Sequence, residues 1–212
     1  MTLPRITTRR QVLRTAVWGA LVASLSLLGV SLPMSDEAEA GQAAKPRVLL
    51  QTNMGDITVE LEPDLVPNTV NNFLAYVKDG HYDGTIFHRV INNFMIQGGG
   101  YNRDYGPLPN RRSAIQNEAD KGLSNERGTI AMARTSDPHS AVDEFYINLK
   151  FNGSLDHRGK RGDAWGYTAF GRVVDGMNIV ARIGLVKTGG AGPFQTDVPL
   201  EAVVIEKATI VQ

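Results

Sequence analysis

The stretch TIFHRVINNFMIQGGG, from Thr85 to Gly100, decides how this chain is interpreted. Two apolar, strand-like runs flank a single arginine and are joined by a turn-prone pair of asparagines. Period-two alternation along the first run places Arg89 on the same face as Phe87 and Ile91. A strand that buries this face must either pair the guanidinium or use it, so Arg89 is the first candidate for a functional residue.

The sequence around this stretch predicts a mainly β domain. Amphipathic helices are predicted at Pro67–Lys78 and Gly176–Ile183, the second with Asp175 as its N-cap, and residues 101–125 read as a long surface loop. Short strands that do not alternate regularly with helices favour an antiparallel sheet. We expect this sheet to close into a barrel whose ends are plugged by the two helices. The predicted strands are 47–52, 56–61, 85–90, 94–98, 128–133, 144–149, 168–174 and 202–212.

Residues 1–40 have the layout of an export signal. Four arginines precede the apolar run Ala16–Val30, which is shorter than the roughly 20 residues that a helix needs to span a bilayer. Ala38 and Ala40 form an A-x-A cleavage pattern, so we expect cleavage after Ala40.

Residues 41–46 then read as a linker and residues 47–212 as one domain. The segment TRRQVLR, residues 8–14, resembles the twin-arginine export motif, so we favour that route to the periplasm over general secretion. An uncleaved membrane anchor is the third alternative. After cleavage we expect no membrane span.

Composition excludes several classes of function. The chain has 22 basic and 22 acidic residues, and removing residues 1–40 takes away four bases and three acids, which leaves a net charge of −1. This balance gives no electrostatic case for binding nucleic acid or a membrane surface. There is no cysteine, so disulfides, thiolate metal sites and thiol nucleophiles are all excluded.

The usual signatures of chemical catalysis are also missing from the sequence. The four histidines stand in no metal-binding frame, and no G-x-S-x-G elbow is present. We expect no metal and no cofactor. His88 is expected to lie bonded in or beside the core, and the alternative for Arg89 is an internal salt bridge that holds the barrel together.

The segment FHRVINNFMIQGG, residues 87–99, resembles the signature of the cyclophilins, which are peptidyl-prolyl cis-trans isomerases. GTIAMART, EFYINL, SLDHRG and YTAFGRVVDGM support the resemblance, which covers nearly all of Arg47–Gln212. NEADKGLSNERGTIAMAR and the export signal make the chain most similar to the bacterial periplasmic branch. The resemblance implies a closed antiparallel eight-stranded β-barrel capped by two α-helices, with the substrate groove on its outside.

The resemblance also implies the site. Arg89 is the catalytic arginine, with Gln97 beside it, and Phe94, Met95 and Leu155 line an apolar pocket for the proline ring. The residue before proline is accompanied by Ala133, Arg134 and Thr135, and Glu144, Tyr146 and Tyr167 complete the groove.

Elementary chemistry agrees with such a site. Amide resonance gives rotation about a peptide bond a barrier of roughly 18–20 kcal/mol, yet isomerisation makes and breaks no bond. A catalyst needs only an apolar pocket for the ring and a donor at the prolyl nitrogen, whose lone pair is freed as resonance is lost. On an apolar strand face with little water, Arg89 would suit that purpose.

Three residues depart from the family pattern: Ser154, which stands where human-type members have tryptophan, and Glu144 and Tyr146, which bear on catalysis. Glu144 stands where most active relatives have glutamine, and a carboxylate there is expected to be able to pair with Arg89 and compete with the substrate. Tyr146 replaces the usual phenylalanine of the proline pocket, and its hydroxyl must find a partner or a water. Both changes bear on the rate rather than on the fold.

Three functions follow from the sequence. The first is a prolyl isomerase that accelerates folding of exported proteins and binds their proline-containing segments as a monomer. The second is a proline-binding chaperone or scaffold that Glu144 and Tyr146 have made weakly active or inactive. The third is a stable barrel whose partner surface is the loop 101–125.

Overall fold

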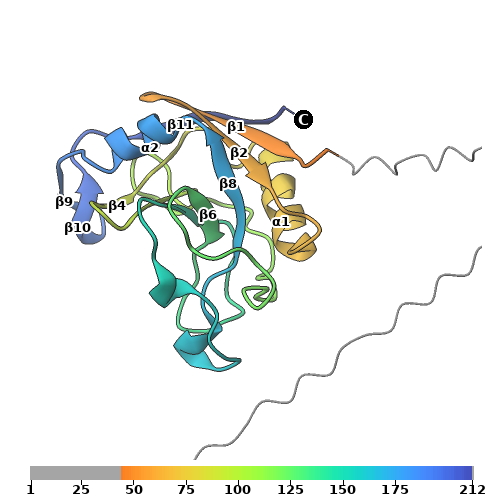
Figure 1. Ribbon diagram of the computed structural model, residues 1–212. Coiled ribbons are helices and arrows are strands. Elements are labelled where there is room, and N and C mark those ends of the chain that lie inside the picture. The colour runs from red at the N-terminus through yellow and green to blue at the C-terminus, as the bar shows by residue number, and fades with distance from the viewer. Residues whose placement is uncertain (1–43, 212) are drawn as a thin grey trace, which may run out of the picture. The chain divides into compact units, whose positions relative to one another are not determined.

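The computed structural model describes residues 44–211, and they form an antiparallel sheet with two α-helices packed on it (Figure 1). The nine-stranded sheet has the order β3-β11-β1-β2-β8-β6-β7-β5-β4, and a separate two-stranded sheet pairs β10 with β9. Its strands are β1 (Arg47–Thr52), β2 (Gly55–Leu61), β3 (Thr85–Ile86), β4 (Arg89–Ile91), β5 (Met95–Gly98), β6 (Thr129–Met132), β7 (Phe145–Asn148), β8 (Ala169–Asp175) and β11 (Val204–Ile210). The other elements are β9 (Thr188–Ala191), β10 (Phe194–Pro199), the helices α1 (Pro67–Lys78) and α2 (Met177–Ile183), and the short 3-10 turns Gly153–Leu155 and Gly162–Trp165.

The prediction of a closed eight-stranded barrel is wrong, because the sheet is curled but open. The single strand predicted at residues 85–90 is broken at Phe87 and His88 into β3 and β4, which lie at opposite edges of the sheet. The backbone N–H of Phe87 donates instead to the carbonyl of Val203. The chain therefore passes from one edge of the sheet to the other without pairing the two edges.

Helix α1 has the predicted bounds, with proline in its first turn, where a missing N–H costs least. Its N-cap residue makes no side-chain capping bond. The Glu118 carboxylate, from the long loop, accepts hydrogen bonds from the backbone N–H of Asn68 and of Thr69, at 3.4 and 2.9 Å. The negative charge thus satisfies free N–H groups at the positive end of the helix dipole.

Helix α2 begins one residue later than predicted, and the expected cap by Asp175 is wrong. Gly176 is the N-cap residue, in the left-handed region at φ 84°, and a Cβ there would lie 2.2 Å from the carbonyl oxygen of Asp56. The carboxylate of Asp175 accepts from the N–H of Gly176, which is not a helical donor. Glycine is required here for both its conformation and its lack of a side chain.

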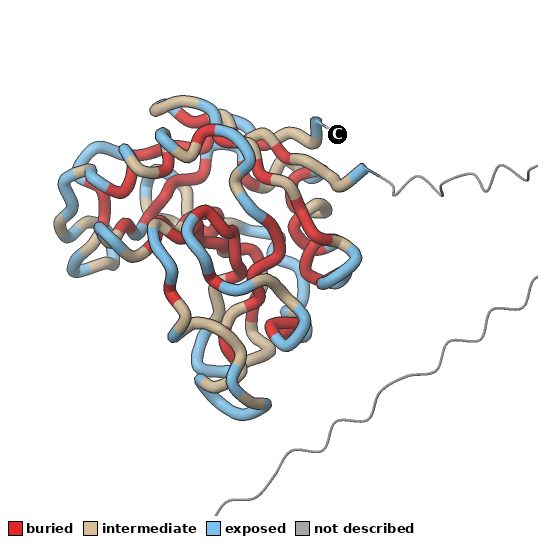
Figure 2. Tube along the Cα trace, in the orientation of Figure 1, coloured by how far each residue is buried: buried red, intermediate tan, exposed pale blue. Residues whose placement is uncertain are grey.

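Aromatic side chains form the centre of the core. Phe73 of α1 lies within 5.1–5.6 Å, between ring centroids, of Tyr82, Phe145 and Phe170, and all four rings are fully buried. Figure 2 shows the buried trace following the sheet and the inner side of α1. Among residues 44–211, no helix is long and apolar enough to cross a membrane.

Candidate active site

Strands β5, β7 and β6 lie side by side, and one face of these strands points away from the main core. Their register places Gln97 opposite Tyr146, and Tyr146 opposite Ala131. The intervening residues, such as Phe145 and Ile147, face the main core. Period-two alternation therefore separates a core face from an outer face, on which the groove is built.

Two cavities lie on this face and share Gln97, Ala133 and Arg134 as lining residues. The first, of about 200 Å³, is called here the apolar cavity and is lined by Arg89, Phe94, Met95, Gln97, Ala133, Arg134, Tyr146, Leu155 and Tyr167. The second, of about 320 Å³, is called the polar cavity and is lined by Gln97, Arg111, Ala133, Arg134, Thr135, Ser140, Val142, Asp143 and Glu144. Together they bring all eleven residues named from the sequence into one groove.

The side chain of Arg89 stands at the rim of the apolar cavity and is 45% exposed. The expectation that it shares a water-poor face with Phe87 is wrong, because the strand break between them resets the alternation. Arg89 pairs with Gln97 across β4 and β5 and donates from Nη1 to its Oε1 at 3.4 Å. Its Nε lies 4.0 Å from the carboxylate of Asp197 in β10. The guanidinium is not buried, and no residue among 44–211 holds it in a close ion pair.

The wall of the apolar cavity is a small cluster separate from the main core. Met95, Tyr146 and two alanines, Ala131 and Ala169, are buried there, and Phe94, Ile91, Ala133, Leu123, Leu155 and Tyr167 pack against them. An apolar group of a ligand would meet this wall with a cationic donor beside it. Among residues 44–211, no group of three or more His, Cys, Asp or Glu side chains could hold a metal ion.

Comparison with known families decides how this groove is classified. The family described as "Cyclophilin type peptidyl-prolyl cis-trans isomerase/CLD" matches residues 47–210. The chain belongs to this family. The predicted enzyme class, a cyclophilin-type peptidyl-prolyl cis-trans isomerase, is confirmed.

Individual cyclophilins give the same result. A peptidyl-prolyl cis-trans isomerase of Streptomyces antibioticus is 54% identical over 77% of this chain and 97% of its own length. Peptidyl-prolyl cis-trans isomerase B of Escherichia coli is 49% identical over 77% of this chain and 98% of its length. A crystal structure of a Cryptosporidium parvum cyclophilin superposes with a TM-score of 0.63 at 25% identity, over 79% of this chain and 98% of that one.

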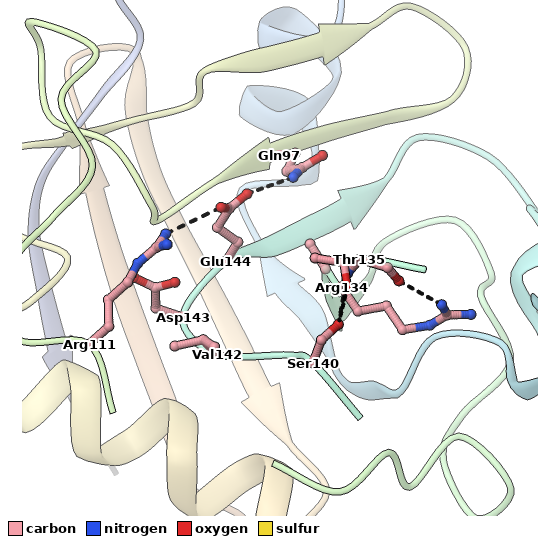
Figure 3. A pocket seen from close by; sticks show the side chains of 9 residues that line it. Gln97, Arg111, Arg134, Thr135, Ser140, Val142, Asp143 and Glu144 are labelled. Atoms are coloured by element: carbon pink, nitrogen blue, oxygen red, sulfur yellow. Dashed lines mark hydrogen bonds and ion pairs between the residues drawn. The ribbon is translucent and has the colours of Figure 1, made fainter. Parts of the chain in front are cut away.

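Glu144 does not pair with Arg89, contrary to the expectation for this departure from the family pattern. Its carboxylate accepts from Gln97 Nε2 at 2.8 Å and from Arg111 Nη2 at 3.3 Å, on separate oxygens (Figure 3). His88 Nε2 lies 3.4 Å from the same oxygen as Gln97. The carboxylate is held away from the catalytic candidate.

The other departure, Tyr146, is accommodated within the fold. Its hydroxyl donates to Asn125 Oδ1 at 2.7 Å in a buried position, as the sequence required of it. Asn125 Nδ2 in turn donates to Asp156 at 2.9 Å, and Asn148 Nδ2 donates to the same Asn125 oxygen at 3.2 Å. The hydroxyl thus joins a satisfied network behind the apolar cavity.

His88 is buried, as expected, but it is poorly bonded. Its ring stacks on Phe194 with centroids 5.3 Å apart, and its Nδ1 has no hydrogen-bond partner in the described part of the chain. Burial, together with the positive charges of Arg89 and Arg111, lowers its pKa to about 4. The imidazole is therefore neutral at physiological pH.

Arg134 lies against the aromatic wall where the two cavities meet. Its guanidinium carbon is 4.4 Å from the centre of the Tyr167 ring, a cation–π geometry. Its Nη1 donates to the carbonyl of Thr135 (Figure 3). Its Nε donates to the carbonyl of Gly166. These contacts fix the guanidinium as part of the groove wall.

Sequence reasoning missed part of the polar cavity. Arg111, Ser140, Val142 and Asp143 line it but stand in loops without periodicity. Asp143 is buried and accepts from His81 Nε2 at 2.9 Å and from Arg111 Nε at 2.8 Å. For Arg111 the available signal was the length of the loop 101–125, which marks functional segments in general but identifies no residue.

Proposed function

We propose that the apolar cavity holds the ring of a substrate proline while Arg89 donates a hydrogen bond to the prolyl nitrogen in the twisted state. The observation that carries this proposal is the position of the Arg89 guanidinium, at the rim of an apolar cavity and without a close ion pair in the part of the chain that the structure describes. As the amide twists, resonance is lost and the nitrogen lone pair becomes an acceptor. A donor placed there lowers the barrier without binding the planar ground state equally well.

Gln97 would hold Arg89 in place, through the bond from Nη1 to Oε1. Phe94, Met95 and Leu155 would enclose the ring, and Tyr146 and Tyr167 would form the floor and side of the cavity. The residue before proline would lie along Ala133, Arg134 and Thr135, at the entrance to the polar cavity, beside Glu144.

The test is cis-trans exchange in a short Ala-Pro peptide, measured by NMR with the purified protein. Uncatalysed isomerisation takes about tens to hundreds of seconds. We expect the protein to make the exchange much faster than this. Peptide binding should shift the signals of Met95, Leu155 and Ala133, while those of residues in α1 stay unchanged. A folded protein that leaves the exchange rate unaltered would contradict the proposal.

We further propose that the protein belongs to the periplasmic branch of bacterial cyclophilins and acts on exported proteins as they fold. The export signal supports this, although residues 1–40 lie outside the described residues. In cells that express the full chain, mass spectrometry should find a mature N-terminus at Gly41. Replacing Arg9 and Arg10 with lysine should retain the precursor, and normal export of that variant would instead indicate the general secretory route.

A further inference from the structure

Four polar side chains form a continuous row from the long loop to the catalytic candidate. Arg111 Nη2 donates to Glu144 Oε1 at 3.3 Å, and Gln97 Nε2 donates to Glu144 Oε2 at 2.8 Å. Gln97 Oε1 then accepts from Arg89 Nη1 at 3.4 Å. Figure 3 shows the first two of these contacts along the upper side of the polar cavity. The row begins at one arginine and ends at another.

The direction of every bond in this row follows from the chemistry of its members. An ionised carboxylate only accepts hydrogen bonds, whereas the glutamine amide has one donating end and one accepting end. Because Glu144 can offer Gln97 only an acceptor, the Gln97 amide must turn its nitrogen towards Glu144. Its oxygen is then left facing Arg89, which only donates.

We propose that Glu144 is a positioning residue, which orients the Gln97 amide so that its oxygen holds the Arg89 guanidinium in the groove. This inference rests on the proposed role of Arg89. From the sequence we expected the Glu144 carboxylate to compete with the substrate for Arg89. In this proposal the same carboxylate supports Arg89.

Arg111 is the fixed end of the row. Its Nε also donates to the Asp143 carboxylate at 2.8 Å, and that carboxylate is only 1% exposed. Arg111 therefore presents a donor to Glu144 from an anchored position. A neutral glutamine at position 144 would turn its amide oxygen towards Arg111 and its nitrogen towards Gln97. The Gln97 amide would then have to rotate, and its nitrogen would face the Arg89 guanidinium, donor against donor.

The charged and titratable groups that face Glu144 are Arg111, Asp143, His88 and Tyr101. Burial raises the pKa of Glu144, and the negative charge of Asp143 adds to the shift, while the bonds from Gln97 and Arg111 oppose it. The carboxylate consequently takes up a proton at a higher pH than an ordinary glutamate. Once protonated it can donate, so the constraint on Gln97 is lost and activity should fall.

The first test is Glu144→Gln, assayed at neutral pH with the same peptide exchange measurement. We expect kcat/KM to fall about tenfold, which corresponds to about 1.4 kcal/mol of transition-state stabilisation, with the loss in kcat and little change in KM. Glu60→Gln is the matched control, because Glu60 is also paired with an arginine, Arg47, and its side chain is 20% exposed against 22% for Glu144. The control should keep full activity.

The second test is rescue by the double variant Arg111→Met/Glu144→Gln. Without the donor of Arg111, glutamine at position 144 is free to turn its oxygen towards Gln97, so the double variant should regain most of the activity that Glu144→Gln loses. A purely structural role for Glu144 predicts the opposite, since two lost contacts should harm the fold more than one. Circular dichroism and thermal unfolding of each variant verify that it is folded.

The third test is the pH profile from about pH 8 to about pH 5, a range above the pKa of His88 of about 4. Because the pKa of Glu144 is raised, the wild type should begin to lose activity towards the acidic end, and the Gln97 side-chain NH₂ signal in NMR should shift in parallel with that loss. The profile of Glu144→Gln should be flat. If Arg89→Ala lowers kcat/KM by about 10²-fold while Glu144→Gln leaves rate and profile unchanged, the positioning role is refuted and the proposed function stands. If neither variant alters the rate, the proposed function itself fails.

Discussion

Replacing Arg89 with alanine should lower kcat/KM by about 10²-fold, because removing one preorganised donor to a transition state typically costs that much. The side chain is 45% exposed and, within residues 44–211, makes only one long hydrogen bond, at 3.4 Å, and one distant ion contact, at 4.0 Å. Its loss should therefore change the free energy of unfolding by no more than about 0.5 kcal/mol. Peptide exchange by NMR and urea unfolding measure the two effects separately.

Two further variants make this result specific. Arg112→Ala is the matched control, since the side chain of Arg112 is 46% exposed and its ion pair with Asp79 lies outside both cavities. It should retain full activity. Arg89→Lys keeps the charge but loses the planar fork of donors, so it should recover only a small part of the rate. Full activity in the lysine variant would mean that charge alone suffices, and full activity in Arg89→Ala would remove Arg89 from the mechanism.

Local patterns predicted the individual elements well. Helix α1 has the predicted bounds because its apolar spacing, its proline in the first turn and the glycine after its end all agree. Strand β1 also has the predicted bounds, and β2 differs by one residue, because each strand alternates between a buried and a more exposed face. In these segments the burial of one face determines the structure, and the spacing of apolar residues in the sequence shows which face is buried.

Long-range pairing decided what the sequence left open. The break at Phe87 and His88 depends on a hydrogen bond to Val203, more than a hundred residues further along the chain, and no local pattern records it. The hairpin of β9 and β10 was missed because its glycines and polar residues show no alternation. That hairpin nevertheless supplies Phe194, which stacks on His88, and Asp197, which lies beside Arg89.

In the active-site groove, too, some features were predicted from the sequence and others depend on contacts between distant parts of the chain. The residues carried over from the cyclophilin motifs were named from the sequence and lie in the groove. The partner of Glu144 could not be foreseen, because Arg111 comes from a loop whose path is fixed by contacts such as the one between Tyr76 and the backbone of Arg112. The resemblance to the cyclophilin motifs identified Glu144, whereas only the packing of the loop determined which cation it meets.

Replacing Phe73 with alanine should destabilise the protein by about 3–5 kcal/mol, the usual cost of removing a buried aromatic ring. Phe73 is fully buried, and its ring contacts those of Tyr82, Phe145 and Phe170, which come from three other parts of the chain. Two of the neighbouring rings, Tyr82 and Phe145, also contact each other with centroids 5.4 Å apart, so we expect them to hold their positions around the gap.

The measurement is urea unfolding followed by circular dichroism, with Phe151→Ala as the control. Phe151 is 63% exposed, so its removal should change the free energy of unfolding by less than about 0.5 kcal/mol. The activity of the folded fraction should survive in Phe73→Ala, because Phe145 faces the core while Tyr146 faces the groove. A loss of specific activity in the folded fraction would show that the core ring sets the geometry of β7, and a destabilisation below about 1 kcal/mol would show that the aromatic cluster repacks around the gap.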